Sequence, residues 1–96
     1  MTKVWARAMT KDKILFDKVL ELDEDFCDDN FFELVAKVCQ AMDVSTPVIL
    51  QKHKNEMKKF NHSIFLANEF MENVDFDKFI IERFDDEEKK DNPFYI

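Results

Sequence analysis

The chain has 96 residues, 46% of them hydrophobic, with eleven Phe, no Gly and a formal net charge of −7. This length predicts one domain with one modest core, and the apolar content argues against intrinsic disorder of its body. The acidic balance disfavours binding to nucleic-acid phosphates, which Lys and Arg neutralise, and the lack of Gly disfavours the glycine-rich loops of nucleotide-binding folds.

The first predicted elements are two strands, in residues 3–9 and 13–22. Side chains in both segments alternate between two sides, and the polar residues 10–12 between them have the composition of a turn, so we expect an antiparallel hairpin. Trp5 and Arg7 fall on the same side of the first strand. They belong either to the core or to an exposed aromatic and arginine anchor of the kind enriched at protein interfaces.

A helix is predicted next, because apolar side chains recur at three- and four-residue spacings in residues 31–42. Asn30 stands where a helix N-cap belongs, and Asp28 and Asp29 lie close to the positive end of the helix dipole. We therefore expect these three residues to stabilise the helix terminus. The helix should end by Asp43.

The second half of the chain predicts shorter elements. Residues 48–50 form an apolar run typical of a short buried strand. Residues 52–60 have the spacing of a second, shorter helix, which Asn61 is placed to close in the left-handed conformation. The expected apolar side of this helix consists of His53, Met57 and Phe60. The remaining expected elements are an extended segment, a turn of helix and a last strand, at residues 63–66, 67–72 and 76–84.

This order of elements predicts an α+β fold. We expect a single globular domain over residues 1–84 and a charged C-terminal tail over residues 85–96. The sheet should be small and antiparallel, built from the N-terminal hairpin and the later strands, and packed on one long helix and one short helix.

Three stretches carry a resemblance to a known family: Val4-Trp5-Ala6-Arg7, residues 43–50 and residues 74–82. They are similar to short proteins common in clostridial-type Firmicutes, and the resemblance covers about residues 3–84. That family has no established activity, so the resemblance implies the same order of elements and a bacterial cytoplasmic setting, but no catalytic residue. The chain departs from the family at Ala6, where Gly is usual, and in its charged tail.

The cellular setting follows from what the sequence lacks. Its longest apolar runs, such as residues 47–50, are far shorter than the about 20 residues of a membrane span. The first residues lack the layout of a signal peptide. Two Cys are too few for a disulfide scaffold. We expect a cytoplasmic protein with reduced thiols and no contact with a membrane.

Few residues suggest catalysis. His53 and Glu56 lie one helical turn apart and His62 follows, so these residues could be metal ligands. We expect instead that the two histidines are surface or partly buried side chains without a metal. Cys27 and Cys39 fit no metal-binding spacing and no activated nucleophile. We expect no enzyme activity, no cofactor and no metal. The rival hypothesis is a small metal- or thiol-dependent enzyme, for which His53, His62 and a carboxylate or Cys27 would have to converge.

Segregated charge suggests instead that the chain binds a protein. Residues 21–29 hold six acids and no base, whereas residues 51–60 hold four Lys and one Glu. Acids not needed by the helix terminus, together with those of the tail, are the candidate partner-binding residues: Asp23, Glu24, Asp25, Asp85, Asp86, Glu87 and Glu88. We expect a small acidic protein-interaction module whose partner is an unidentified protein, with nucleic acid disfavoured as a partner.

Two other interpretations of the acids stay open. A nucleic-acid-mimic inhibitor, for example a phage-type anti-CRISPR protein, would present an acidic surface to a basic groove, and complementary charge would mainly speed association. Alternatively, the acids only keep a Phe-rich domain soluble. The lysines of residues 51–60 either contact phosphates or form an ordinary solvated helix face. The sequence predicts no oligomeric state.

Overall fold

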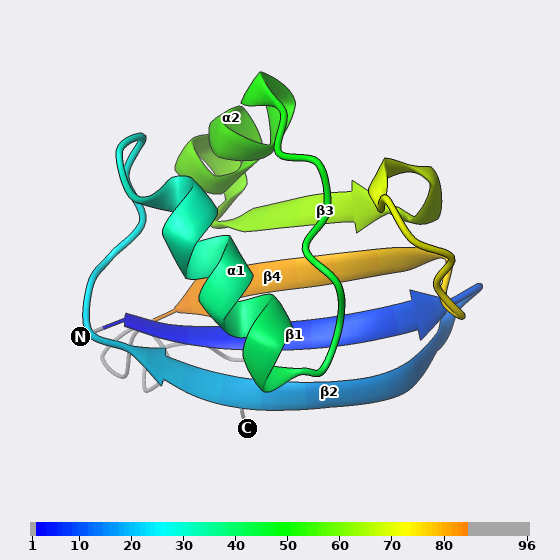
Figure 1. The fold of residues 1–96 in the computed structure, drawn as a ribbon. Coiled ribbons are helices and arrows are strands. Elements are labelled where there is room, and N and C mark those ends of the chain that lie inside the picture. The colour runs from blue at the N-terminus through cyan, green and yellow to red at the C-terminus, as the bar shows by residue number, and fades with distance from the viewer. Residues whose placement is uncertain (1, 85–96) are drawn as a thin grey trace.

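The computed structural model describes residues 2–84, which form a four-stranded sheet and two helices (Figure 1). The predicted α+β class is confirmed. The helices have 11 and 10 residues, so the expected contrast between a long and a short helix is slight. In chain order the elements are β1 (Thr2–Thr10), β2 (Lys13–Leu22), α1 (Phe31–Ala41), α2 (Gln51–Phe60), β3 (His62–Leu66), the 3₁₀ turn η1 (Ala67–Glu69) and β4 (Lys78–Phe84).

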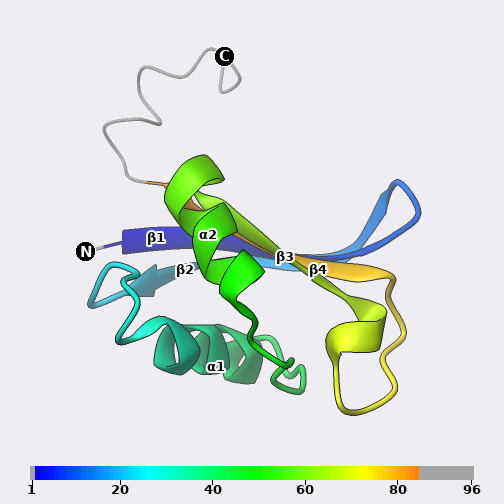
Figure 2. The same cartoon turned by 90° about the horizontal axis from the view of Figure 1, so that it is seen from above.

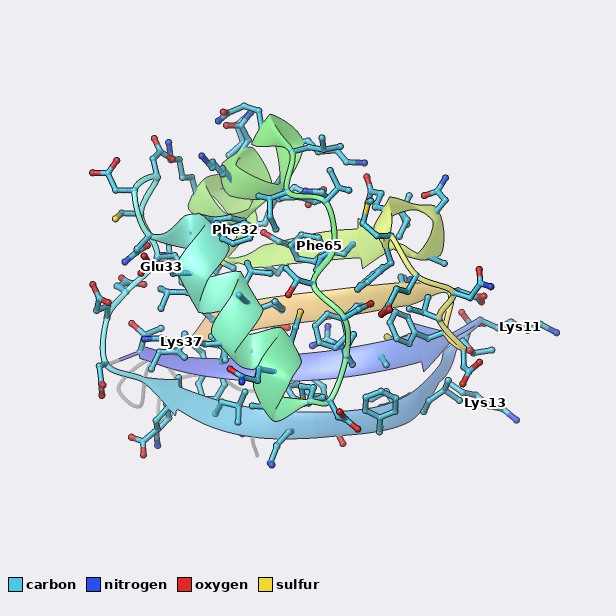
Figure 3. All side chains as sticks on the ribbon, in the orientation of Figure 1. Lys11, Lys13, Phe32, Glu33, Lys37 and Phe65 are labelled. Carbon is cyan, nitrogen blue, oxygen red and sulfur yellow. The ribbon has the colours of Figure 1, made fainter. Side chains whose placement is uncertain are left out.

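The sheet has the strand order β2-β1-β4-β3, and every neighbouring pair is antiparallel. The predicted hairpin is confirmed in β1 and β2, and its turn places Lys11 at a positive φ of 54°. Figure 3 shows Lys11 and Lys13 projecting from this end of the sheet. A register shift between Ala8 and Met9 marks a bulge in the hairpin. The inner strand β1 thus pairs with β2, the next strand along the chain, and with β4, the last strand of the described residues.

The core lies between the sheet and α1. On β1, Val4, Ala6 and Ala8 are fully buried, as are Val35 and Val38 on α1. Figure 2 shows α1 on one side of the sheet, and Figures 1 and 2 together place α2 beyond the β3 edge. The α1 prediction is confirmed because its three- and four-residue apolar spacing meets this single buried face. The exposed side of α1 carries Glu33 and Lys37 (Figure 3).

Two predictions in the second half are wrong. Residues 48–50 form no strand, and Val48 and Leu50 are exposed; Pro47 makes an isolated bridge with Phe70, and the Val48 amide donates to the Glu69 carbonyl at 2.8 Å. A strand at residues 48–50 would need a sheet edge to pair with, and α2 lies at the edge beside β3. Phe60 is also not on the buried side of α2, since it is 60% exposed.

The other boundaries differ by little. Asn61 closes α2 at φ 61°, ψ 21°, and its backbone N–H donates to the Met57 carbonyl, as predicted. The expected helical turn is the 3₁₀ turn η1. The last strand begins at Lys78 rather than at residue 76, because Phe76 turns into the core before the strand starts. Within residues 2–84, neither helix is long and apolar enough to cross a membrane.

Candidate functional site

The acidic loop between β2 and α1 is tied down by basic residues from other elements. The Asp25 Oδ1 atom lies 3.0 Å from Nη1 of Arg83, at the end of β4, and also accepts the Phe26 amide at 2.8 Å. Asp28 lies 3.0 Å from Nζ of Lys58 on α2. The oppositely charged segments seen in the sequence therefore contact each other within one molecule. Asp25, expected to be superfluous locally, holds the loop to β4.

Asn30 also serves the loop rather than the helix end. It occupies the N-cap position of α1, but its side chain makes no capping hydrogen bond. Its Oδ1 atom accepts the Cys27 amide, and its Nδ2 donates to the Asp25 carbonyl, each at 2.8 Å. The predicted side-chain cap is thus wrong, because the Asn30 side chain hydrogen-bonds to the backbone of the preceding turn instead of to the helix N-terminus.

Asp23 and Glu24 are exposed, and their role in partner binding stays a prediction. The same holds for Asp25, whose side chain is 65% exposed beside its Arg83 partner. The other predicted partner-binding residues, Asp85, Asp86, Glu87 and Glu88, lie outside the described residues. Within the acidic loop, Asp23 and Glu24 are thus exposed, whereas Asp25 and Asp28 are each paired with a basic residue.

His53 is fully buried, and both of its ring nitrogens are engaged. Its Nδ1 atom accepts the Leu50 amide at 2.9 Å, so the ring proton is on Nε2, which lies 3.3 Å from Oε1 of Glu69. The ring packs on Phe65 with a centroid distance of 4.2 Å. With no free lone pair, His53 is not arranged as a general base. It holds the start of α2 against η1.

Glu69 is the acceptor at the centre of this cluster. Its side chain is 11% exposed, and its carboxylate meets Lys52 Nζ at 2.6 Å and the Leu66 amide at 2.8 Å. Burial by itself would raise the pKa of Glu69, but the hydrogen bonds from Lys52, Leu66 and His53 outweigh burial and hold the pKa below its ordinary value. The cluster is a satisfied structural network.

The side chains of the rival enzyme hypothesis have separate partners. The Glu56 carboxylate accepts the Ile64 amide at 3.1 Å, and His62 stacks on Phe60. Among residues 2–84, no three His, Cys, Asp or Glu side chains group closely enough to hold a metal ion. Burial raises the pKa of Cys39 to about 12, so this thiol stays protonated. Cys27 is exposed.

A groove lies between the loop after α1 and the loop before β4. It has a volume of about 300 Å³, and three acids line it: Asp43, Glu72 and Asp75. Ser45 also lines it, and its Oγ atom is buried without a hydrogen-bond partner in the described chain. No base or thiol lies among the lining residues, so the groove offers no nucleophile with an activating partner.

The face of the sheet opposite α1 carries a second set of side chains. Residues directly opposite on neighbouring strands share a face, so the register defines three rows across β2, β1, β4 and β3. We name these twelve residues the open face, because α1 lies on the other side of the sheet (Figure 2); the end of α2 reaches its margin, where Phe60 stacks on His62. The rows are Val19-Trp5-Glu82-His62, Asp17-Arg7-Ile80-Ile64 and Ile14-Met9-Lys78-Leu66.

Trp5 and Arg7 form the centre of the open face. The Trp5 Nε1 donates to Asp17 at 2.8 Å, and the Arg7 guanidinium carbon lies 4.0 Å from the centroid of the Trp5 ring. Arg7 also donates to Glu82 at 3.1 Å, and its side chain is only 16% exposed. These contacts fix both side chains in place. Of the two alternatives, Trp5 is thus on the face away from the main core.

Apolar side chains surround this fixed centre. Val19, Ile14 and Leu66 are 57%, 44% and 42% exposed, whereas Ile80 between them is buried. The formal charges of the open face balance, with Arg7 and Lys78 against two acids. The face is thus a largely apolar surface with an ordered aromatic centre and no net charge.

Comparisons of this chain with protein-family models, curated proteins and solved structures give no significant match. A function therefore has to be inferred from the chain's own side chains and their arrangement.

Proposed function

We propose that this chain is a non-enzymatic protein-interaction module and that the open face is its contact surface. The observation that carries the proposal is the arrangement of Trp5, held in place by Asp17 and Arg7 on the face of the sheet away from α1. Trp and Arg dominate the energetics of protein interfaces when they stand near the centre of the contact.

The preorganised position of the Trp5 side chain also supports this proposal. A partner that packs on Trp5 does not have to immobilise it, because its indole N–H and its ring face are already engaged. Immobilising a free side chain costs about 0.5–1.5 kcal/mol on binding, and this cost is avoided here. Twelve side chains are fewer than the about 20–30 per partner of a standard interface, so the expected complex is transient rather than permanent.

The charge pattern indicates the chemistry of the partner. Balanced charges on the open face suit a protein surface that is apolar at its centre and carries sparse charges of both signs at its rim. They do not suit nucleic-acid phosphates. A nucleic-acid mimic needs a continuous acidic surface, and Arg83 and Lys58 interrupt the acidic loop.

The engaged nitrogens of His53 and the raised pKa of Cys39 support a role without catalysis. For the cellular setting we propose the bacterial cytoplasm, on the strength of the resemblance to clostridial-type proteins. The acidic composition would then serve solubility, which a module with an exposed apolar face requires.

The test compares two single substitutions of exposed apolar residues in pull-downs from a lysate of the source organism. Val19→Asp places a charge on the open face, and Met71→Asp places the same charge on a loop residue that is 82% exposed. We expect a partner that wild type and Met71→Asp retain and Val19→Asp loses. Equal retention by both variants would exclude the open face as the contact surface.

A further inference from the structure

The two edges of the sheet differ in whether their backbone amides have partners. At the β3 edge, the Glu56 carboxylate of α2 accepts the Ile64 amide at 3.1 Å, and Glu69 of η1 accepts the Leu66 amide at 2.8 Å. These two carboxylates occupy the positions that an added strand would need. β3 is also only five residues long. The β3 edge is therefore closed to further strand pairing.

The closed edge also defines which backbone groups of β2 point outward. In an antiparallel sheet, the amide and carbonyl groups of successive residues point alternately to the two sides of a strand. Since Ile64 and Leu66 point away from β4, the register carries this alternation through β4 and β1 to β2. The residues of β2 whose backbone groups point to β1 are Phe16, Lys18, Leu20 and Leu22. Those whose backbone groups point away from the sheet are Asp17, Val19 and Glu21.

The β2 edge is open as far as residues 2–84 are concerned. β2 is the outermost strand (Figure 1), and the outward amides of Asp17, Val19 and Glu21 donate to no described residue. β2 contains no Pro, and the bulge beside Ala8 lies outside residues 16–22. Val19 is 57% exposed. Residues 16–22 thus form a regular strand edge of the kind that readily pairs with another strand.

We propose that the β2 edge binds an extended basic segment of another protein as an added antiparallel strand. The backbone groups of Asp17, Val19 and Glu21 pair with the segment, and the side chains beside them select its sequence. This inference goes beyond the open face as a contact surface, since it rests on the backbone of β2 and not on Trp5.

Charge defines the chemistry of the segment. Residues 17–24 carry four acids and one base, and the exposed Asp23 and Glu24 directly follow β2. Lys3 stands opposite Glu21 on β1, and acids still outnumber bases at this edge. Opposite charges on directly opposed residues stabilise the pairing of two strands. A segment with cations opposite Asp17 and Glu21, and an apolar residue opposite Val19, therefore fits this edge.

A second copy of the chain is a poorer occupant. In the two-fold antiparallel pairing that overlaps all of residues 16–22, Val19 faces itself, and Asp17 of each copy faces Glu21 of the other. Like charges directly opposite each other are destabilising. The two copies would also each bring a net charge of −7. Charge therefore favours a basic segment from a different protein.

The probe is a synthetic peptide, acetyl-Thr-Lys-Val-Val-Thr-Lys-Val-amide, added to the isotope-labelled full chain. In the antiparallel register its two Lys stand opposite Glu21 and Asp17, and its central Val stands opposite Val19. One control peptide has Glu in place of both Lys. The other control has an N-methyl group on the central Val, which removes an amide that faces β2. Amide hydrogen exchange, followed residue by residue by NMR, reports the pairing.

In the free protein, the amides of Asp17, Val19 and Glu21 should exchange quickly and those of Lys18 and Leu20 slowly, because only the latter point to β1. We expect the Lys peptide to bind with a dissociation constant of about 0.1 mM. At about 1 mM it should then slow exchange of the three outward amides about tenfold, since they exchange only while the peptide is dissociated. Both control peptides should leave their exchange unchanged.

Three results would overturn the proposal. The first is slowing by less than about twofold at about 1 mM Lys peptide. The second is equal slowing by the Lys and Glu peptides, which would exclude a basic occupant. The third is slow exchange of the outward amides in the free protein. If that protection rises with protein concentration, the occupant is a second copy; otherwise the edge is already paired within the chain.

A variant of the protein tests the same pairing from the other side. Glu21→Pro removes an outward amide, and Pro is tolerated where the amide of an edge strand faces solvent. Its matched control, Glu21→Gln, keeps the amide and removes only the charge. The affinity for the Lys peptide should fall about tenfold in Glu21→Pro and about threefold in Glu21→Gln. Equal affinities of wild type and Glu21→Pro would overturn strand addition.

Circular dichroism establishes that each variant is folded. If Glu21→Pro does not fold, the N-methyl peptide still tests the backbone pairing on the unaltered protein. The peptide assay contains no partner from a lysate, so its outcome is independent of the Val19→Asp pull-down that tests the proposed function.

Discussion

Replacing His53 tests whether the buried cluster beneath α2 is structural. His53→Ala removes a fully buried ring that packs on Phe65, and it leaves the Leu50 amide without its acceptor. Truncation of a large buried ring costs about 3–5 kcal/mol. An unpaired buried polar group alone costs about 1–3 kcal/mol. We expect a loss of about 3–5 kcal/mol, a large part of the about 5–15 kcal/mol that stabilises a domain.

The assay is urea unfolding followed by Trp5 fluorescence and by circular dichroism. With a slope of about 1.5 kcal/mol per M, the midpoint for His53→Ala should fall by about 2–3 M. A second variant, His53→Phe, keeps an aromatic ring against Phe65 but removes both ring nitrogens, so its loss should be smaller and close to the polar contribution of about 1–3 kcal/mol.

The control is the chain's other histidine. His62 stacks on Phe60, itself largely exposed, so we expect His62→Ala to cost within about 0.5–1 kcal/mol. If His53→Ala and His62→Ala lowered the free energy of unfolding equally, the structural account of the His53 cluster would be refuted.

Three other predictions follow from the ion pairs and thiols. Glu69 has a lowered pKa in the folded chain, so its contribution to stability is present above its ordinary pKa and is lost as pH falls through the lowered value. In Glu69→Gln the free energy of unfolding should therefore depend less on pH between about pH 3 and 6. Urea titration at several pH values measures this dependence. Arg83→Met should lower the free energy of unfolding by about 1–3 kcal/mol, because the Arg83 side chain hydrogen-bonds to Asp25 and to the end of α2. Asp25→Asn should lower it by less than about 1 kcal/mol, since this carboxylate is exposed. Equal losses in urea unfolding would contradict this ranking. Mass spectrometry after brief iodoacetamide treatment at pH 8 should find Cys27 alkylated and Cys39 unmodified, and modification of Cys39 in the native state would show that it is not buried.

Local patterns in the sequence were sufficient for most elements. The alternation in residues 3–9 and 13–22 predicted the hairpin, and the helical spacing in residues 31–42 predicted α1, because each pattern reflects one buried side. Asn61 ended α2 as expected, since few residues other than Gly tolerate the left-handed conformation. The failures were short or terminal segments. Val48, Leu50 and Phe60 are apolar, but the neighbouring elements leave them exposed.

The candidate site was only half visible in the sequence. Alternation placed Trp5 and Arg7 on a common side of β1, yet each side of that strand contains apolar residues, so the pattern left open which side is covered. The acidic loop was misread for a related reason. Asp25 and Asp28 appeared to serve a local purpose or none, whereas their partners Arg83 and Lys58 lie 58 and 30 positions away in the chain.

The sequence by itself determined the N-terminal hairpin, α1 with its buried side, and the residue that ends α2, because backbone propensity and periodic burial are properties of a few consecutive residues. Tertiary structure alone decided that α1 covers the Val4 side of β1 and that α2 lies at the β3 edge. That placement leaves Trp5 on an uncovered face and brings Arg83 to the acidic loop. Such pairings depend on the packing of segments far apart in the chain, which local propensity does not encode.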